Sequence, residues 1–198
     1  MEKDNIRNML LKIGRQIVQE KGSEALTVRK LSEASGCSVG AIYNQFANME
    51  NFIVIENYLT LEVLGKKLAA VKETQNPYFD MNGMLNVFVD FVLKNKNLWY
   101  LLYQFHLRKE KHRYSFIYLR QIATITRRLN QLVRRIVPQM EQPERILSSQ
   151  VLWLTLFALS SLLTKDILDS FSKINRQTLC QIMLNTYIAG LTVLEKKE

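Results

Sequence analysis

The residues best suited to hold a binding partner form a short run of small and polar side chains, Ser38, Val39, Gly40 and Ala41. Serine is favoured at the position just before a helix begins. The first backbone N–H groups of a helix are free to donate, and the helix dipole places partial positive charge beside them. Small side chains there let the backbone approach another molecule closely. The run therefore suits the binding of anionic groups such as phosphates.

Two short helices and a turn must position this run. Thr27 can cap the first helix, in which Leu31 then points inward. Helices that cross steeply need a residue with positive φ between them, which Gly36 supplies. Ile42 fills the angle between the helices and leaves the opposite face of the second helix free. This spacing is typical of a helix-turn-helix, which places its second helix in the major groove of DNA.

Residues for catalysis or metal binding are few. The two histidines, His106 and His112, lie six positions apart and do not share a helix face, so we expect no metal site. Cys37 and Cys180 are far apart, which indicates a reducing compartment without a disulfide framework. The sequence has no serine–histidine–acid arrangement, glycine-rich phosphate loop or cysteine-rich cluster. We therefore expect neither an enzyme nor a cofactor.

Most of the chain has the apolar periodicity of amphipathic helices. It contains only 7 Gly and 3 Pro in 198 residues, and no segment alternates as a strand does. The spacing predicts a first helix up to Lys21, short helices after Thr27 and over residues 39–45, and further helices at about 49–72, 81–94, 96–107, 113–137, 144–169 and 175–196. We predict an all-α fold of about nine helices, with a helix-turn-helix domain over residues 1–48 and a helical domain over residues 49–198.

The composition fits a packed protein with an anionic partner. Hydrophobic residues make up 47% of the chain, which argues against pervasive disorder. The net charge of +9 favours DNA, RNA, an anionic surface or an acidic small molecule. The N-terminus lacks the apolar region of a secretory signal, and the most apolar run, residues 151–163, is too short to cross a bilayer. We expect a soluble, cytoplasmic protein without membrane contact.

From Thr27 to Phe46 the sequence reads TVRKLSEASGCSVGAIYNQF and resembles the DNA-binding segment of the TetR family of transcriptional regulators. The helix ending at Lys21 and the Glu50–Asn51–Phe52 run extend the resemblance to about residues 6–55. The resemblance implies three helices for DNA and about six for ligand binding and dimerisation. It also implies three partners: double-stranded operator DNA, a second copy of the chain and a small-molecule effector.

The resemblance also implies roles for individual residues. Val39 and Gly40 would lie against base edges, with Ala41 close by. Phosphate contacts are implied for Thr27, Arg29, Ser38, Tyr43, Asn44 and Gln45. Asn44 and Gln45 could also read bases. Two residues depart from the family pattern: Met49 stands where a phosphate-binding lysine is usual, and Gln45 where histidine or tyrosine is common. Both weaken the expected hold on the DNA backbone.

A basic helix is predicted over residues 113–135. Arg113, Arg120, Arg127 and Arg134 recur every seven residues and line one face, while the opposite face is apolar. The simplest interpretation is the solvated face of an amphipathic helix. The alternative is a surface that attracts an anionic ligand or DNA phosphates.

The aromatic segment over residues 97–106 offers walls for a ligand. Such a stripe is usually core, but in the TetR family the middle helices enclose the ligand cavity. The resemblance therefore implies a pocket with walls formed by Trp99, Tyr103, Phe105, His106 and Tyr118.

The last two predicted helices carry more apolar surface than one copy of the chain can cover. Apolar stripes along both helices indicate an intersubunit four-helix bundle. We expect this interface to contain Leu152, Leu156, Leu159, Leu163, Met183, Tyr187, Leu191 and Leu194. A homodimer carries two recognition helices, which suits a palindromic site.

These features predict a sequence-specific DNA-binding regulator, a repressor released from a palindromic operator when a small molecule binds the C-terminal domain. Ligand release and its sign come from the resemblance to the family. Two alternatives remain open. One is a binder of nucleic acid or anionic surfaces that ignores sequence and uses the basic helix. The other is a TetR-type regulator without a small-molecule ligand.

Overall fold

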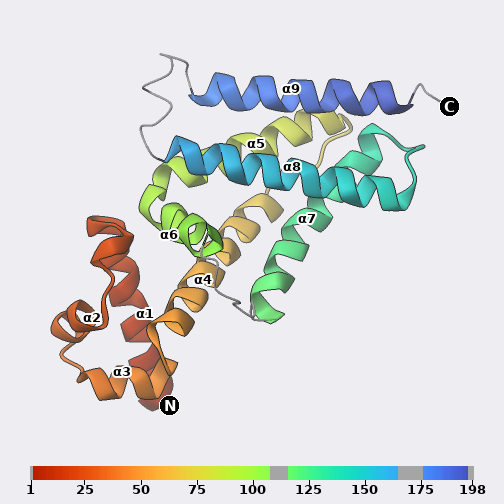
Figure 1. Cartoon of the computed structure of the whole chain (residues 1–198). Helices are drawn as coiled ribbons and strands as arrows, with labels where there is room; N and C mark the ends of the chain where they lie inside the picture. Colours follow the sequence, from red (N-terminus) through yellow and green to blue (C-terminus); the bar gives the residue numbers. More distant parts are fainter. Residues whose placement is uncertain (1, 108–115, 165–175, 196–198) are drawn as a thin grey trace. The chain divides into compact units, whose positions relative to one another are not determined.

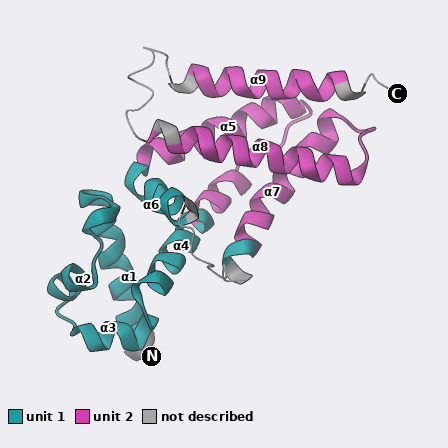
Figure 2. Cartoon of the chain, in the orientation of Figure 1, with its two compact units in different colours: residues 1–62, 95–119 teal, residues 63–94, 120–198 magenta. Residues whose placement is uncertain are grey.

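The computed structural model describes residues 2–107, 116–164 and 176–195. Within these ranges the regular elements are all helices, so the predicted all-α fold is confirmed (Figure 1). The chain divides into two compact units, which Figure 2 shows in different colours. Unit 1 comprises residues 1–62 and 95–119, and unit 2 comprises residues 63–94 and 120–198.

Unit 1 joins the N-terminal helices to a helix from the middle of the chain. Its elements are α1 (Glu2–Lys21), the 3-10 turn η1 (Ser23–Ala25), α2 (Val28–Ser35), α3 (Val39–Phe46), the first part of α4 (Met49–Ala69) and α6 (Lys96–Leu107). The α6 helix packs against α1, and Asn97 Nδ2 donates a hydrogen bond to Gln19 O at 2.9 Å. Contacts thus group α6 with the N-terminal helices, while the functional division at residue 48 stays a prediction.

Unit 2 contains the end of α4, α5 (Pro77–Lys94), nearly all of α7 (Phe116–Ile136), α8 (Gln142–Leu163) and α9 (Arg176–Glu195). The α5 helix begins a turn earlier than its sequence pattern predicts. Asn76 Oδ1 accepts hydrogen bonds from the backbone N–H groups of Tyr78 and Phe79 at 3.0 and 3.2 Å, and proline is favourable at a helix start. The predicted start of a helix near residue 113 and the predicted end of another near residue 169 fall outside the described residues.

Side chains fix the starts of both short helices of unit 1. Thr27 Oγ1 accepts a hydrogen bond from Lys30 N at 3.2 Å, and Ser38 Oγ accepts one from Ala41 N at 3.2 Å. Gly36 ends α2 with a φ of 70°, a left-handed conformation that glycine adopts without steric cost. The caps and the turn predicted from the sequence are therefore confirmed.

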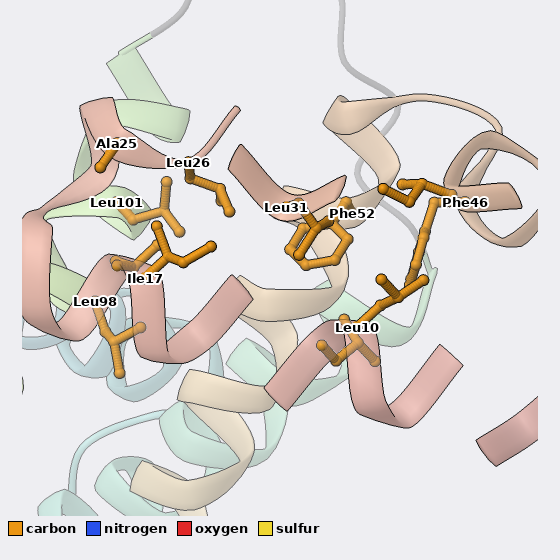
Figure 3. Packing of buried hydrophobic residues seen from close by; sticks show 12 residues of the cluster. Leu10, Ile17, Ala25, Leu26, Leu31, Phe46, Phe52, Leu98 and Leu101 are labelled. Atoms are coloured by element: carbon orange, nitrogen blue, oxygen red, sulfur yellow. The ribbon is translucent and has the colours of Figure 1, made fainter. Parts of the chain in front are cut away.

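An apolar cluster holds α2 and α3 against α1 and α4 (Figure 3). It includes Leu10 of α1, Leu31 of α2 and Ile42 of α3, all at most 1% exposed. Phe46 of α3 meets Phe52 of α4 edge-on, with ring centroids 4.8 Å apart. The orientation of α3 is thus set by buried side chains on one of its faces.

Replacing Gly14 by alanine is expected to lower the free energy of unfolding by about 1–3 kcal/mol, because it overpacks this core. A Cβ at residue 14 would lie 2.7 Å from Cε1 of Phe52 and closer still to Cζ. Phe52 is fully buried and cannot move without disturbing Phe46. Urea unfolding of both proteins measures the difference.

The matched control is Gly83→Ala in α5, whose Cβ would meet Val71 at an ordinary 3.4 Å. It should stabilise the protein by about 0.5–1 kcal/mol, the usual gain when alanine replaces a glycine inside a helix. Equal stabilisation by both substitutions would contradict the tight packing of Gly14 against Phe52.

Two arginines of α7 fasten the segment that joins α4 to α5. Arg128 Nη2 donates to Val71 O at 2.7 Å, and Arg135 Nη1 donates to Asp80 Oδ2 at 2.6 Å. Asp80 is 2% exposed and also accepts hydrogen bonds from the backbone N–H and hydroxyl of Thr74. Burial acts to raise the pKa of Asp80, but the hydrogen bonds from Thr74 and Arg135 outweigh it and hold this pKa below its ordinary value.

Candidate nucleic-acid interface

The residues predicted to contact DNA lie at the surface of unit 1, on the start of α2 and along α3. Val39 and Tyr43 are each 39% exposed, whereas Ile42 and Phe46 on the same helix are buried. The exposed members of the predicted set are Thr27, Arg29, Ser38, Val39, Gly40, Tyr43 and Asn44, and the half-buried ones are Ala41 and Gln45. The α3 helix therefore has one face in the core and one face available to a partner.

The exposed face combines the donors that phosphates and base edges need. The first N–H groups of a helix have no partner inside the helix, and the capping oxygens of Thr27 and Ser38 each use one of them. Arg29 pairs with Glu33 at 3.0 Å, but both side chains are exposed and such a pair contributes at most about 1 kcal/mol. A phosphate can therefore compete for the Arg29 guanidinium.

Gly40 leaves open space at the start of α3. A Cβ at this position would meet only Ser38 Oγ, at an ordinary 3.9 Å. The fold thus tolerates a side chain at residue 40. A partner lying against this turn would collide with that side chain.

Sequence reasoning missed Arg7, which holds the end of α3. Its guanidinium donates a hydrogen bond to the backbone oxygen of Gln45 and lies over the ring of Phe46, 4.7 Å from the centroid. A cation at the C-terminus of a helix is favourable because the last carbonyls carry partial negative charge. The helical pattern of α1 gave no signal of this role, since the contact joins residues 38 positions apart.

A buried polar group links α1 to α4 behind this face. Glu56 and Thr60 of α4 are at most 1% exposed, and Arg15 Nη1 donates to Thr60 Oγ1 at 3.1 Å and to Glu56 Oε2 at 3.4 Å. Loss of hydration on burial raises the pKa of Glu56 to about 7, although the positive charge of Arg15 opposes this. Glu56 therefore titrates near neutral pH in the folded chain.

The free energy of unfolding is expected to fall as pH rises from about 5 to 7. The folded chain holds the Glu56 proton up to a pKa of about 7, whereas the unfolded chain releases it near 4.5. The higher pKa of the folded chain stabilises the fold by roughly 3 kcal/mol at pH values below 4.5, where this contribution is complete. The contribution decreases above pH 4.5 and is lost as pH rises through 7. Urea titrations across this range measure the slope.

Glu56→Gln should flatten this dependence, because glutamine stays neutral at every pH. The control, Glu33→Gln, removes an exposed carboxylate and should leave the slope unchanged. Parallel pH profiles for wild type and Glu56→Gln would show that another group is responsible.

An apolar cavity lies in unit 2. Its volume is about 20 Å³, and its walls come from five helices: Leu68 of α4; Met81, Met84, Leu85 and Phe88 of α5; Ile125 and Leu129 of α7; Leu152, Trp153 and Leu156 of α8; and Leu184 of α9.

The aromatic residues assigned to a pocket from the sequence do not line this cavity. Trp99, Phe105 and Tyr118 are buried in unit 1, Tyr103 is half-buried there, and the side chain of His106 lies outside the described part. The role of the aromatic segment stays a prediction, and the cavity of unit 2 is a separate candidate ligand site.

The residues assigned to the dimer interface differ in their burial within the single chain. Leu152, Leu156 and Leu191 are at most 6% exposed, because they face the core of their own unit. Leu159, Met183 and Tyr187 are half-buried, and the side chains of Leu163 and Leu194 lie outside the described part. The exposed large apolar side chains of these helices are other residues: Ile146, Leu147, Val151 and Leu154 on α8, and Ile182 and Val193 on α9.

The described part of the basic face of α7 is exposed, as its sequence predicts. Arg128 and Arg135, which are not members of this face, are bound to the α4–α5 segment and to Asp80, and Arg113 lies outside the described residues. Arg120, Arg127 and Arg134 are exposed. These three form the described part of the surface that could attract anions.

Other candidate chemistry is sparse in the ranges that the structure describes. No group of three or more His, Cys, Asp or Glu side chains there could hold a metal ion. Burial raises the pKa of the Cys180 thiol to about 11, which keeps it protonated at neutral pH. None of the described helices combines the length and apolar character required to span a membrane.

Capped short helices, a left-handed turn and an exposed second helix define unit 1 as a helix-turn-helix module. Residues 10–54 match the family of bacterial regulatory proteins known as the tetR family. No curated protein sequence matches the chain. The N-terminal part of the chain therefore carries a DNA-binding domain of the tetR type, and the fold supports a DNA-binding transcriptional regulator.

Solved structures share this fold along nearly the whole chain. PfmR, a TetR family transcriptional regulator from Thermus thermophilus, has a TM-score of 0.63 at 18% identity and covers 91% of this chain and 97% of its own. The fatty acid degradation regulator FadR from Bacillus halodurans has a TM-score of 0.68 at 16% identity, with 92% and 98% covered. The ketosteroid transcriptional regulator KstR2 of Mycobacterium tuberculosis has a TM-score of 0.60 at 18% identity, with 93% of each chain covered. At these identities the likeness establishes the fold.

Proposed function

We propose that the protein is a dimeric repressor that binds a palindromic operator through α3 and leaves it when a small molecule binds unit 2. The exposed face of α3 carries this proposal, because Ile42 and Phe46 anchor the helix while Val39, Gly40 and Tyr43 stay accessible. The tetR-family match over residues 10–54 supports the same role. Val39 and Gly40 contact bases, and the polar residues of the face hold phosphates.

The second copy of the chain covers the exposed apolar face of α8 and α9. Leu147, Val151 and Leu154 are 55–62% exposed and follow one stripe of α8 at spacings of four and three. Ile182 and Val193 are 55 and 58% exposed and lie 11 positions apart, which is three helical turns. Tyr187 and Ser148 join the two helices through a 2.7 Å hydrogen bond. Pairing two such faces buries these side chains in a four-helix bundle.

Ligand release requires a conformation that binds the effector well and the operator poorly. The α4 helix carries the coupling, since it is continuous from Met49 to Ala69 and contributes residues to both units. Just beyond its last residue, the Val71 oxygen accepts a hydrogen bond from Arg128. A ligand that displaces this end acts on the helix that leaves the DNA-binding unit.

Selection from a random duplex library tests the proposal. One palindromic motif, with half-sites separated by about one turn of DNA, is the expected product. Retention of DNA without any motif, lost when Arg120, Arg127 and Arg134 are changed to glutamine, would replace the proposal with sequence-independent binding by α7.

A further inference from the structure

The cavity of unit 2 has almost wholly apolar walls. Leucine, methionine, isoleucine, phenylalanine and Trp153 line it, and its 20 Å³ is room for about one water molecule. The indole N–H of Trp153 is the one conventional hydrogen-bond donor among these side chains, fewer than the two to four partners that a buried water needs, so the cavity stays dry. A ligand that enters exchanges no water and gains apolar contacts directly.

Asp80 and Arg128, which adjoin the wall residues Met81 and Leu129 in sequence, already have partners. Asp80 precedes Met81 of the wall, and its carboxylate accepts hydrogen bonds from Arg135 and Thr74. A charged ligand group buried in this wall would have no counter-ion, which costs far more than burial of hydrocarbon. None of the side chains that line the cavity is charged, so none can balance the charge of a ligand. The cavity therefore favours uncharged ligands over charged ones.

We propose that the effector is an uncharged molecule that inserts a hydrocarbon group, aliphatic or aromatic, into this cavity. The inference rests on the proposed function and names the chemical class of its ligand. Most effector-sized molecules need a pocket of about 300–1,000 Å³, so they cannot enter the cavity as it stands. Binding must enlarge the cavity.

Two features of the wall allow the cavity to enlarge and connect that enlargement to α4. Met81 and Met84 are flexible, polarisable side chains that adapt to an inserted group. Leu68 belongs to the last turn of α4, the helix proposed to carry the coupling. A ligand that widens the space between α5, α7 and α8 thus displaces Leu68 and acts on α4. The ligand-free and ligand-bound forms must differ in shape, which is the requirement for coupling to DNA.

Methyl NMR of the full chain with labelled methionines tests the ligand class without DNA. The probes are toluene, benzoate and benzylammonium, which share a ring and differ in charge. Toluene should shift the Met81 and Met84 methyls saturably, benzoate and benzylammonium should not, and the exposed Met9 methyl serves as the internal control. Equal shifts with all three probes, or no toluene shift beyond that of Met9, would overturn the proposal.

Two substitutions at Leu129 make the test independent of folding defects. Leu129→Phe fills the cavity and should abolish toluene binding, whereas Leu129→Ala enlarges it and should tighten binding several-fold. Unchanged toluene affinity in Leu129→Ala would place the binding site elsewhere and overturn the assignment.

A DNA-binding measurement distinguishes failure of the proposed function from failure of the proposed ligand class. Toluene should lower the affinity of wild type for its selected duplex by about 5- to 150-fold, the usual range of coupling between sites. If toluene occupies the cavity and DNA affinity stays the same, the ligand class stands and ligand release is wrong. If no duplex is selected, the NMR result still decides the ligand class.

Discussion

Gly40→Asp is expected to abolish sequence-specific DNA binding while leaving the fold as stable as wild type or more stable. A side chain at residue 40 meets only Ser38 Oγ, at 3.9 Å, so the core is untouched. An aspartate in the first turn of α3 interacts favourably with the helix dipole, by about 0.3–1 kcal/mol. On DNA the same carboxylate would push α3 away from the bases and repel phosphates. Loss of two base contacts, at about 1–3 kcal/mol each, lowers affinity at least about 30-fold.

Two measurements separate these effects: thermal unfolding for stability, and titration of the selected duplex for affinity. Gln142→Asp is the matched control, because it adds the same charge to an exposed position in the first turn of α8. It should keep wild-type affinity. A Gly40→Asp variant that is folded and still binds the selected duplex tightly would show that α3 does not read the DNA.

Leu154→Arg is expected to convert the dimer to a monomer and to weaken operator binding by at least about 100-fold. Leu154 is 61% exposed at the C-terminal end of the apolar stripe on α8. In a four-helix bundle the arginine would be buried against a second apolar face without a counter-ion. A monomer also loses the gain that comes from tethering two recognition helices, because the second half-site no longer binds at high effective concentration.

Sedimentation equilibrium and duplex titration measure the two consequences of Leu154→Arg together. Leu119→Arg is the control, since Leu119 is 49% exposed on α7 and lies off the proposed interface. It should remain dimeric and keep its affinity. A dimeric Leu154→Arg protein would exclude the stripe of Leu147, Val151 and Leu154 as the interface.

The helix-turn-helix was predictable because its determinants are local. Thr27 and Ser38 cap helices through hydrogen bonds to residues three positions away, and Gly36 supplies a backbone conformation that other residues rarely adopt. Such signals act within one turn of helix, so spacing alone reveals them. Ile42 was likewise identified as buried from its position relative to the turn.

The ligand and dimer surfaces were less predictable because they depend on contacts distant in sequence. The α8 helix is apolar on two faces: Leu152 and Leu156 pack inside their own unit, while Val151 and Leu154 are exposed. Periodicity finds apolar stripes but does not say which stripe the chain itself covers. Trp99 was assigned to a pocket for a similar reason, since a core aromatic and a pocket aromatic look alike in sequence.

The most direct test of sequence-specific binding by α3 compares wild type on the selected duplex and on a scrambled duplex of equal length and composition, at two salt concentrations. We expect the selected duplex to bind at least about 1,000-fold more tightly at physiological salt. Affinity for the scrambled duplex should fall steeply as salt rises, because that binding rests on phosphate contacts alone. Equal affinities for both duplexes, falling together with salt, would contradict sequence-specific recognition by α3.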